Sequence, residues 1–122
     1  TLYSDKNRIS RVLHNLVSNA ITYHNPSQEN PYVKINVNTD EDKSLIEIED
    51  NGIGINNEYH EKVFEMFYRG NENSSGSGLG LYIAKETVEK LNGNISLESK
   101  PGIGTKFKLS LPNLFDQQRE AV

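Results

Sequence analysis

The stretch Ser44-Leu45-Ile46-Glu47-Ile48-Glu49-Asp50-Asn51-Gly52-Ile53-Gly54 leads an alternating strand into a glycine turn. The strand period of two places Ile46, Ile48 and Asp50 on one face and the glutamates on the other. A carboxylate on an apolar face is costly to desolvate unless it has dedicated partners. Asp50 is therefore a candidate for accepting a hydrogen bond from a ligand, beside glycines that permit close approach. Because Asp-Asn-Gly is also a common turn sequence, the stretch alone leaves both interpretations open.

Composition places the chain among ordinary globular domains. Its 122 residues, of which 34% are hydrophobic and 25% charged, are enough to build one hydrophobic core. The net charge of -4 disfavours sequence-independent binding of nucleic acid, which needs a basic surface. The absence of cysteine excludes a disulfide, a thiol nucleophile and a cysteine-bound metal. There is no membrane-spanning run or signal peptide, and a start at Thr1 rather than Met suggests a piece of a longer protein.

The helical spacing of apolar residues predicts a first helix over Lys6–Tyr23, with Asp5 as its N-cap. Asn15, Asn19 and Tyr23 are four residues apart, so they fall on one row along the edge of the apolar stripe. Asparagines on a helix are usually surface residues. The position of this row beside the core is what makes it a candidate for function.

The same two periodicities predict the remaining elements. These are a strand over 32–38, the strand ending at Asp50, a short helix over 59–67, a helix over 79–91 and strands over 94–99 and 105–111. Inward-facing side chains are expected at Val33, Ile35, Val37, Val63, Phe64, Phe67, Leu81, Ile83, Ala84, Val88 and Leu91. Gly93 should provide a left-handed cap. The order predicts an α+β fold, a two-layer sandwich with a mixed, mainly antiparallel sheet, helices on one face and a flexible glycine-rich lid.

The run Gly76-Ser77-Gly78-Leu79-Gly80-Leu81 opens a helix. Free backbone N–H groups and the positive end of a helix dipole suit phosphate oxygens. The glycine spacing differs from the dinucleotide fingerprint, and no P-loop sequence occurs. An inward carboxylate can accept from a base amino group, and two asparagines offer oxygens of the kind that bind Mg²⁺. Together these features point to a nucleoside triphosphate bound between the layers.

Five motifs, in this order, resemble the conserved boxes of sensor histidine kinases. These are Asn15-Leu16-Val17-Ser18-Asn19-Ala20 (N box), Asp50-Asn51-Gly52-Ile53-Gly54 (G1 box), Phe64-Glu65-Met66-Phe67 (F box), the run from Gly76 to Leu81 (G2 box) and Gly102-Ile103-Gly104-Thr105, a further glycine motif. They span nearly the whole chain. Residues 1–112 therefore resemble the catalytic ATP-binding domain (HATPase, Bergerat type) that these kinases share with gyrase, mismatch-repair and heat-shock-chaperone ATPases. Residues 113–122 are expected to be a C-terminal tail.

The resemblance implies a role for each matching residue. Asp50 would accept from the exocyclic amino group of adenine, and Asn19 would bind Mg²⁺ with Asn15 as a second ligand or an orienting group. Tyr23 would cover the adenine or ribose. Asn15 and Arg69 are the candidate catalytic residues, Arg69 at the terminal phosphate. The residues expected to contact the nucleotide are Asn15, Asn19, Tyr23, Asp50, Gly52, Gly54, Ile55, Phe67, Gly76, Gly78, Leu79, Gly80, Leu81 and Thr105.

One position departs from the family pattern. Thr22 stands where a lysine or arginine commonly precedes the tyrosine, which puts a phosphate contact from that position in doubt. Arg8 and Lys62 are the candidates to replace it.

The resemblance also implies the function. Such a domain would bind Mg-ATP and transfer the γ-phosphoryl group to a histidine on a separate dimerisation and phosphoacceptor domain, with a response regulator downstream. Contact with nucleic acid or directly with a membrane is not expected, and the domain would be cytoplasmic even in a membrane-anchored parent. Two alternatives stay open, a degenerate nucleotide-binding module and a hydrolysing ATPase. Asn15 disfavours hydrolysis, because hydrolysing relatives carry a glutamate there as general base.

Overall fold

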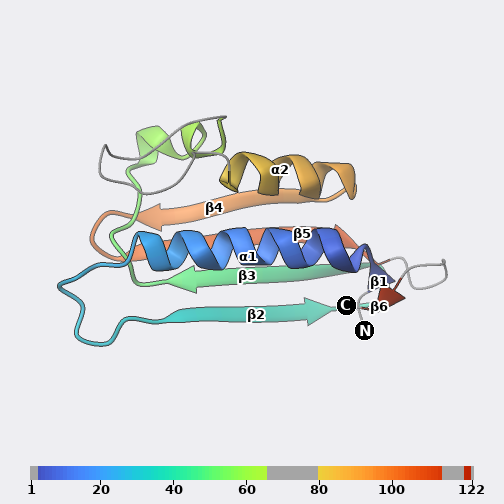
Figure 1. Cartoon of the computed structure of the whole chain (residues 1–122), viewed down its shortest axis with the longest axis horizontal. Coiled ribbons are helices and arrows are strands. Elements are labelled where there is room, and N and C mark those ends of the chain that lie inside the picture. The colour runs from blue at the N-terminus through green and yellow to red at the C-terminus, as the bar shows by residue number, and fades with distance from the viewer. Residues whose placement is uncertain (1–2, 66–79, 114–119, 122) are drawn as a thin grey trace.

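The computed structural model describes residues 3–65, 80–113 and 120–121 of the chain. In these residues four strands form an open sheet, helices cover one of its faces, and a two-stranded ribbon pairs segments near the two termini (Figure 1). The elements are β1 (Tyr3–Ser4), α1 (Lys6–Thr22), β2 (Val33–Thr39), β3 (Lys43–Asp50), the 3-10 turns η1 (Asn57–Tyr59) and η2 (Lys62–Phe64), α2 (Gly80–Lys90), β4 (Asn94–Lys100), β5 (Gly104–Pro112) and β6 (Glu120–Ala121).

The sheet order is β2-β3-β5-β4, and all three neighbouring pairs are antiparallel. The predicted α+β sandwich is confirmed, but the expectation of a mixed sheet is wrong for the described strands, which make no parallel pair. Two of these pairs, β2–β3 and β4–β5, are hairpins, since short connections join antiparallel neighbours without a crossover. The pairing of β3 with β5 brings the hairpins together.

Side chains on the helix-facing side of the sheet line up in rows that cross three strands. Read from β3 through β5 to β4, the rows are Ile46 with Leu109 and Ile95, Ile48 with Phe107 and Leu97, and Asp50 with Thr105 and Ser99. Two apolar rows thus end in a polar row, at the end of the sheet where β3 stops. The alternation that predicted Asp50 beside the isoleucines is confirmed, because Ile46, Ile48 and Asp50 are all buried.

Helix α1 packs its apolar stripe onto this face. Its buried residues are Ile9, Val12, Leu16 and Ala20. Asp5 is the N-cap, as predicted, and its carboxylate accepts a hydrogen bond from the Arg8 N–H at 3.1 Å. Helix α2 adds Ala84 and Val88 to the core. Phe64 of η2 closes the core by packing edge-on against Phe107, with 6.1 Å between ring centroids.

Strand β2 differs from the prediction. Val33, Ile35 and Val37 lie on the helix-facing side, because they pair with the buried residues of β3. They are nevertheless 38%, 48% and 59% exposed, so the expected inward burial is wrong. β2 is one of the two edge strands, and α1 lies over β3 and β5 (Figure 1). Alternation predicts the side of a sheet on which a residue lies, whereas its burial depends on where the helices are.

Helix α2 and the residues that follow it correct two further expectations. Ile83 is 37% exposed rather than inward-facing. The left-handed residue after the helix is Asn92, with φ of 62°, and not Gly93. Asparagine tolerates this conformation better than most residues with a Cβ. Gly93 has another reason to be glycine, because an added Cβ would lie within 3.0 Å of the Ser110 carbonyl oxygen.

Two regions add further detail. In place of the short helix predicted over 59–67, the described residues form the turns η1 and η2, and Val63 and Phe64 are buried as expected. Within the tail predicted over 113–122, strand β6 pairs with β1. No helix in the described part of the chain is long and apolar enough to cross a membrane.

Candidate functional site

Asp50 is the last residue of β3 and is 9% exposed. Its Oδ1 accepts a hydrogen bond from the Gly52 N–H at 2.8 Å. Burial raises the pKa of Asp50 above its ordinary value, the backbone N–H groups of Gly52 and Thr105 act in the opposite direction, and Glu49 raises it further. Among the described residues no cation forms an ion pair with this carboxylate. The site therefore holds a buried acceptor that can take a donor from a ligand.

The glycine turn after Asp50 is clamped on both sides by backbone. On the helix side, the Ile53 N–H donates to the Tyr23 carbonyl at 3.1 Å. On the hairpin side, the Gly102 N–H donates to the Ile53 carbonyl at 2.7 Å. A Cβ at Gly52 would lie 2.5 Å from the Tyr23 carbonyl oxygen. Close backbone packing gives these glycines an immediate structural reason, and the role predicted for them in admitting a base stays a prediction.

Gly54 and Gly104 let the backbone of the glycine turn pack directly against the backbone of the β4–β5 hairpin. A Cβ at Gly54 would lie within 3.0 Å of the Lys100 carbonyl oxygen, and one at Gly104 within 3.0 Å of the Asp50 carbonyl oxygen. Both glycines have positive φ, 75° and 142°. The two turns therefore fit together only without side chains at these positions.

The predicted row on α1, Asn15, Asn19 and Tyr23, runs toward the glycine turn that follows Asp50. Asn15 donates from Nδ2 to the carbonyl of Gly80, the first residue of α2, at 3.4 Å. Asn19 is half-buried, and no side-chain hydrogen bond of its amide is found with the described residues. Tyr23 ends the helix, with its N–H donating to the Asn19 carbonyl at 3.0 Å. The structure thus joins the row to the start of α2 at Asn15 and to the glycine turn at Tyr23.

Ser99 is a site residue that the sequence analysis did not identify. Its Oγ accepts from the Ile55 N–H at 2.7 Å and lies 2.7 Å from the Thr105 Oγ1. Ile55 is also held at its carbonyl oxygen, which lies 3.0 Å from Nε2 of His60. The signal was available, because Ser99 is the polar end of the alternation that includes Leu97, as Asp50 is for its own strand.

The other predicted residues divide into two groups. Phe67, Arg69, Gly76, Gly78 and Leu79 lie outside the described residues. Gly80 and Leu81 form the first turn of α2, where Leu81 packs against the core and a Cβ at Gly80 would meet nothing within 4 Å.

Neither candidate for the missing cation at Thr22 is shown at that position. Arg8 is wrong as a replacement, because it pairs with Asp5 at 3.4 Å, at the opposite end of α1. Lys62 places its Nζ over the Tyr59 ring, 5.8 Å from the centroid.

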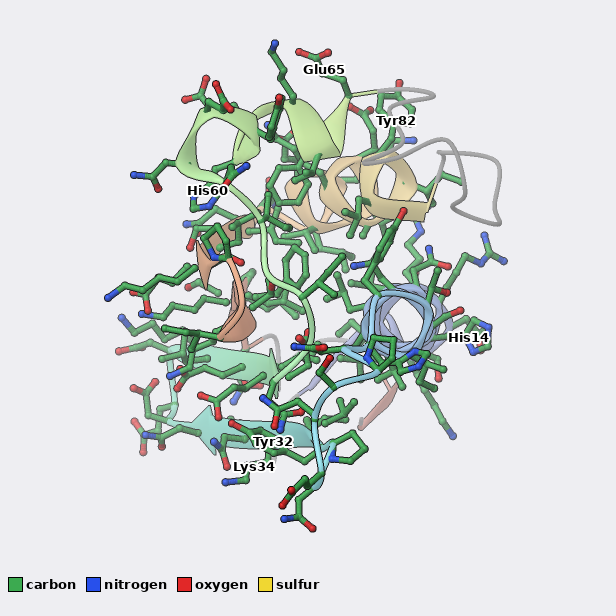
Figure 2. The ribbon with its side chains drawn as sticks, turned by 90° about the vertical axis from the view of Figure 1, so that its left-hand side faces the viewer. His14, Tyr32, Lys34, His60, Glu65 and Tyr82 are labelled. Atoms are coloured by element: carbon green, nitrogen blue, oxygen red, sulfur yellow. The ribbon has the colours of Figure 1, made fainter. Side chains whose placement is uncertain are left out.

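An open pocket of about 580 Å³ adjoins the polar row at this end of the sheet. It shares Asp50 and Thr105 with the predicted site but none of its α1 residues, and Tyr32 and His60 also line it. Figure 2 faces this end of the molecule and shows His14 on the far side of α1, pointing away from the sheet. The pocket therefore extends from the polar row away from α1.

Comparison with known proteins assigns this arrangement to a family. Residues 4–114 match the family described as histidine kinase-, DNA gyrase B- and HSP90-like ATPases. The sensor protein RprX of Bacteroides fragilis (strain YCH46) is 40% identical over 119 residues, covering 93% of this chain and 22% of that protein. The sensor histidine kinase WalK of Bacillus subtilis (strain 168) is 39% identical over 118 residues, covering 93% and 19%. The chain thus spans about a fifth of the length of these relatives.

Solved structures share the fold. The mycobacterial sensor histidine kinase MprB matches with a TM-score of 0.75 at 30% identity, over 89% of this chain and 72% of that chain. A nucleotide-free catalytic domain of the histidine kinase ThkA gives 0.75 at 32% identity, over 90% and 70%. Full-length ShkA in complex with AMPPNP gives 0.80 at 24% identity, covering 93% of this chain and 23% of that one, which shows the fold alone. The chain therefore belongs to the histidine kinase-, DNA gyrase B- and HSP90-like ATPase family, as a histidine kinase catalytic domain with the Bergerat fold.

Proposed function

We propose that this domain binds Mg-ATP and transfers its γ-phosphoryl group to a histidine on a separate dimerisation and phosphoacceptor domain. The observation that carries the proposal is Asp50, a buried carboxylate at a strand end. Its hydrogen-bond donors in the described residues are the backbone amides of Gly52 and Thr105. An acceptor held in this way fits a ligand that brings its own donor, and the exocyclic amino group of adenine is such a donor.

The start of α2 and the asparagine row fit the phosphate end of the nucleotide. The first N–H groups of a helix have no partner within the helix, and they suit phosphate oxygens. Asn15 lies against this helix start through its contact with Gly80. The base and phosphate ends of the proposed ligand would therefore lie along one side of α1.

The same residues fit Mg²⁺, which prefers oxygen ligands and commonly bridges substrate phosphates while keeping bound waters. Because Nδ2 of Asn15 donates to Gly80, its Oδ1 remains for another partner, and Asn19 offers a second amide oxygen one turn later. In the described ranges no group of three or more His, Cys, Asp or Glu could hold a metal. Asn19 and Asn15 would then hold the ion together with the phosphates. When bound, it would neutralise charge on the transferring group.

Asn15 favours phosphoryl transfer over hydrolysis. Hydrolysis needs a general base for the attacking water, and an amide cannot take that proton. A neutral imidazole nitrogen can attack without such a base, provided that the site holds the terminal phosphate in line with it. The new N–P bond forms as the bond to the β–γ bridging oxygen breaks, and ADP leaves. Arg69 is our candidate for contacting the terminal phosphate.

The chain spans about a fifth of its curated relatives, so the parent protein enters only as part of this proposal. We infer that the acceptor histidine lies on a dimerisation domain outside this chain. A response regulator would then receive the phosphoryl group. We assign the domain to the cytoplasm, whether or not the parent is membrane-anchored.

Two measurements test the proposal. Mg-ATP should raise the melting temperature of the wild type, because a ligand that binds only the folded state stabilises it. Asp50→Asn should abolish this shift, and an unchanged shift would remove Asp50 from base recognition. Radiolabel from γ-labelled ATP should appear on a separately supplied acceptor domain. Phosphate release without an acceptor would instead favour an ATPase, and binding without either reaction would leave a nucleotide-binding module.

A further inference from the structure

The polar row contains a hydroxyl that the proposed function does not use. Ser99 pairs with Thr105 across β4 and β5, as Thr105 pairs with Asp50 across β5 and β3. The Ser99 Oγ lies 2.7 Å from the Ile55 nitrogen, 2.8 Å from the Gly104 carbonyl oxygen and 2.7 Å from the Thr105 Oγ1. Three polar groups thus converge on one hydroxyl, which has a single proton and two lone pairs.

The chemistry of the three partners fixes where the protons lie. A backbone amide only donates and a carbonyl only accepts, so Ser99 accepts from Ile55 and donates its proton to Gly104. The contact between the two hydroxyls must then use the proton of Thr105, donated to Ser99. Only this arrangement satisfies all three contacts at once. The Thr105 Oγ1 is therefore left with lone pairs and no free proton.

We propose that Ser99 is a positioning residue that makes the base-reading end of the site accept hydrogen bonds only. The Asp50 carboxylate and the Thr105 hydroxyl oxygen are neighbours in one cross-strand row, and both are buried. A purine with a 6-amino group places N–H donors at its 6-position, where such a pair can accept them. A 6-oxo purine places an acceptor at that position and carries its one donor on this edge at N1. Ser99 would thus help to select adenine over 6-oxo purines. This inference rests on the proposed function, because it takes Asp50 as the base-reading residue.

A purely structural role would have a different signature. Ser99 also anchors the end of the glycine turn through Ile55, so its loss could loosen the turn. A loosened turn would weaken all nucleotides alike. Freeing the proton of Thr105 instead gives the site a donor that a 6-oxo group can accept, which changes the ratio between nucleotides. The ratio of the two affinities therefore separates the two roles.

The test is calorimetric titration of the wild type and of variants with Mg-ATP and Mg-ITP, whose base carries a 6-oxo group. Ser99→Ala should lower the preference for ATP over ITP about tenfold, which corresponds to about 1.4 kcal/mol. Ser99→Thr keeps the hydroxyl and should restore the wild-type ratio. Ser96→Ala is the matched control, because Ser96 lies on β4 but is exposed and faces the other side of the sheet.

The results of this titration distinguish failure of the Ser99 inference from failure of the proposed function. An unchanged ratio in folded Ser99→Ala, including an equal loss for both nucleotides, overturns the inference and leaves the proposed function intact. No binding of Mg-ATP by the wild type refutes the proposed function itself. If circular dichroism shows that Ser99→Ala is unfolded, Ser99→Cys replaces it, because a thiol keeps the unbranched side chain and fills the site but is a weak hydrogen-bond partner. A wild-type ratio in that variant would equally overturn the inference.

Discussion

Gly54 and Gly102 offer a matched test of the clamp between the glycine turn and the β4–β5 hairpin. Their φ angles are nearly equal, 75° and 78°, both in the left-handed region. Alanine at Gly102 would meet nothing within 4 Å, so in the folded state this variant adds only left-handed strain, about 1–2 kcal/mol. The lower entropy of the unfolded alanine chain offsets about 0.4–1 kcal/mol of that strain in either variant. Alanine at Gly54 carries the same strain, and its Cβ also overlaps the Lys100 carbonyl group. Relieving that overlap adds about 1–3 kcal/mol.

We therefore expect Gly54→Ala to lose about 1–4.5 kcal/mol of unfolding free energy, and Gly102→Ala at most about 1.5 kcal/mol. Urea unfolding followed by circular dichroism measures both against the wild type, with free energies extrapolated linearly to water. In a domain of this size, 1 kcal/mol corresponds to roughly 4 °C in melting temperature. Equal losses in the two variants would refute the reasoning, because their strain is matched and only the overlap differs.

Three further predictions follow from other parts of the structure. Burial raises the pKa of Asp50 in the folded state above its ordinary value of 3.8. Ionisation of this carboxyl therefore lowers the stability of the wild type as pH rises from 3.8 through the raised value. Asparagine does not ionise, so the unfolding free energy of Asp50→Asn should rise relative to that of the wild type over the same window. Unfolding free energies of both proteins across this window check the sign, and a difference that does not vary with pH would contradict it. Asn92→Gly should stabilise by roughly 0.5–1 kcal/mol, the left-handed strain less the greater unfolded-state entropy of glycine. Gly93→Ala should destabilise by about 1–3 kcal/mol because its Cβ meets the backbone of β5, and thermal unfolding should show opposite signs for these two variants. Asn19→Ala should weaken Mg-ATP roughly tenfold while leaving adenosine binding unchanged in calorimetry, and an equal loss for adenosine would exclude a role at the metal.

Local signals account for the parts of the fold that the sequence predicts well. Helix α1 is expected over Lys6–Tyr23 and observed over Lys6–Thr22, because its cap and its apolar spacing both lie within the segment. Strand β3 likewise presents its residues as the alternation predicts. The burial of Ile35 depends instead on where α1 lies over the sheet, which no local pattern contains.

In the candidate site, too, local patterns predict how single elements present their residues but not which elements come together. Asp50 is predicted to face inward and does so, because that depends on one strand alone. The contact of Asn15 with Gly80 joins two motifs that the sequence marks separately. Ser99 was missed, although it ends an alternation just as Asp50 does, because only the strand register places it beside Thr105. The ligand roles of these residues remain predictions.

The polar row also has a consequence for the order of folding. The hairpins β2–β3 and β4–β5 each join strands that are close in the chain, whereas pairing Asp50 with Thr105 closes the long intervening segment. Closing a long loop costs more entropy than forming a hairpin, so we expect β3–β5 docking to come later. The two halves of the row would then meet only at that step. Pulse-labelled hydrogen exchange should show the amides of the two hairpins protected before the Gly102 amide, because that amide donates to the Ile53 carbonyl in the turn after β3. Simultaneous protection would contradict this order.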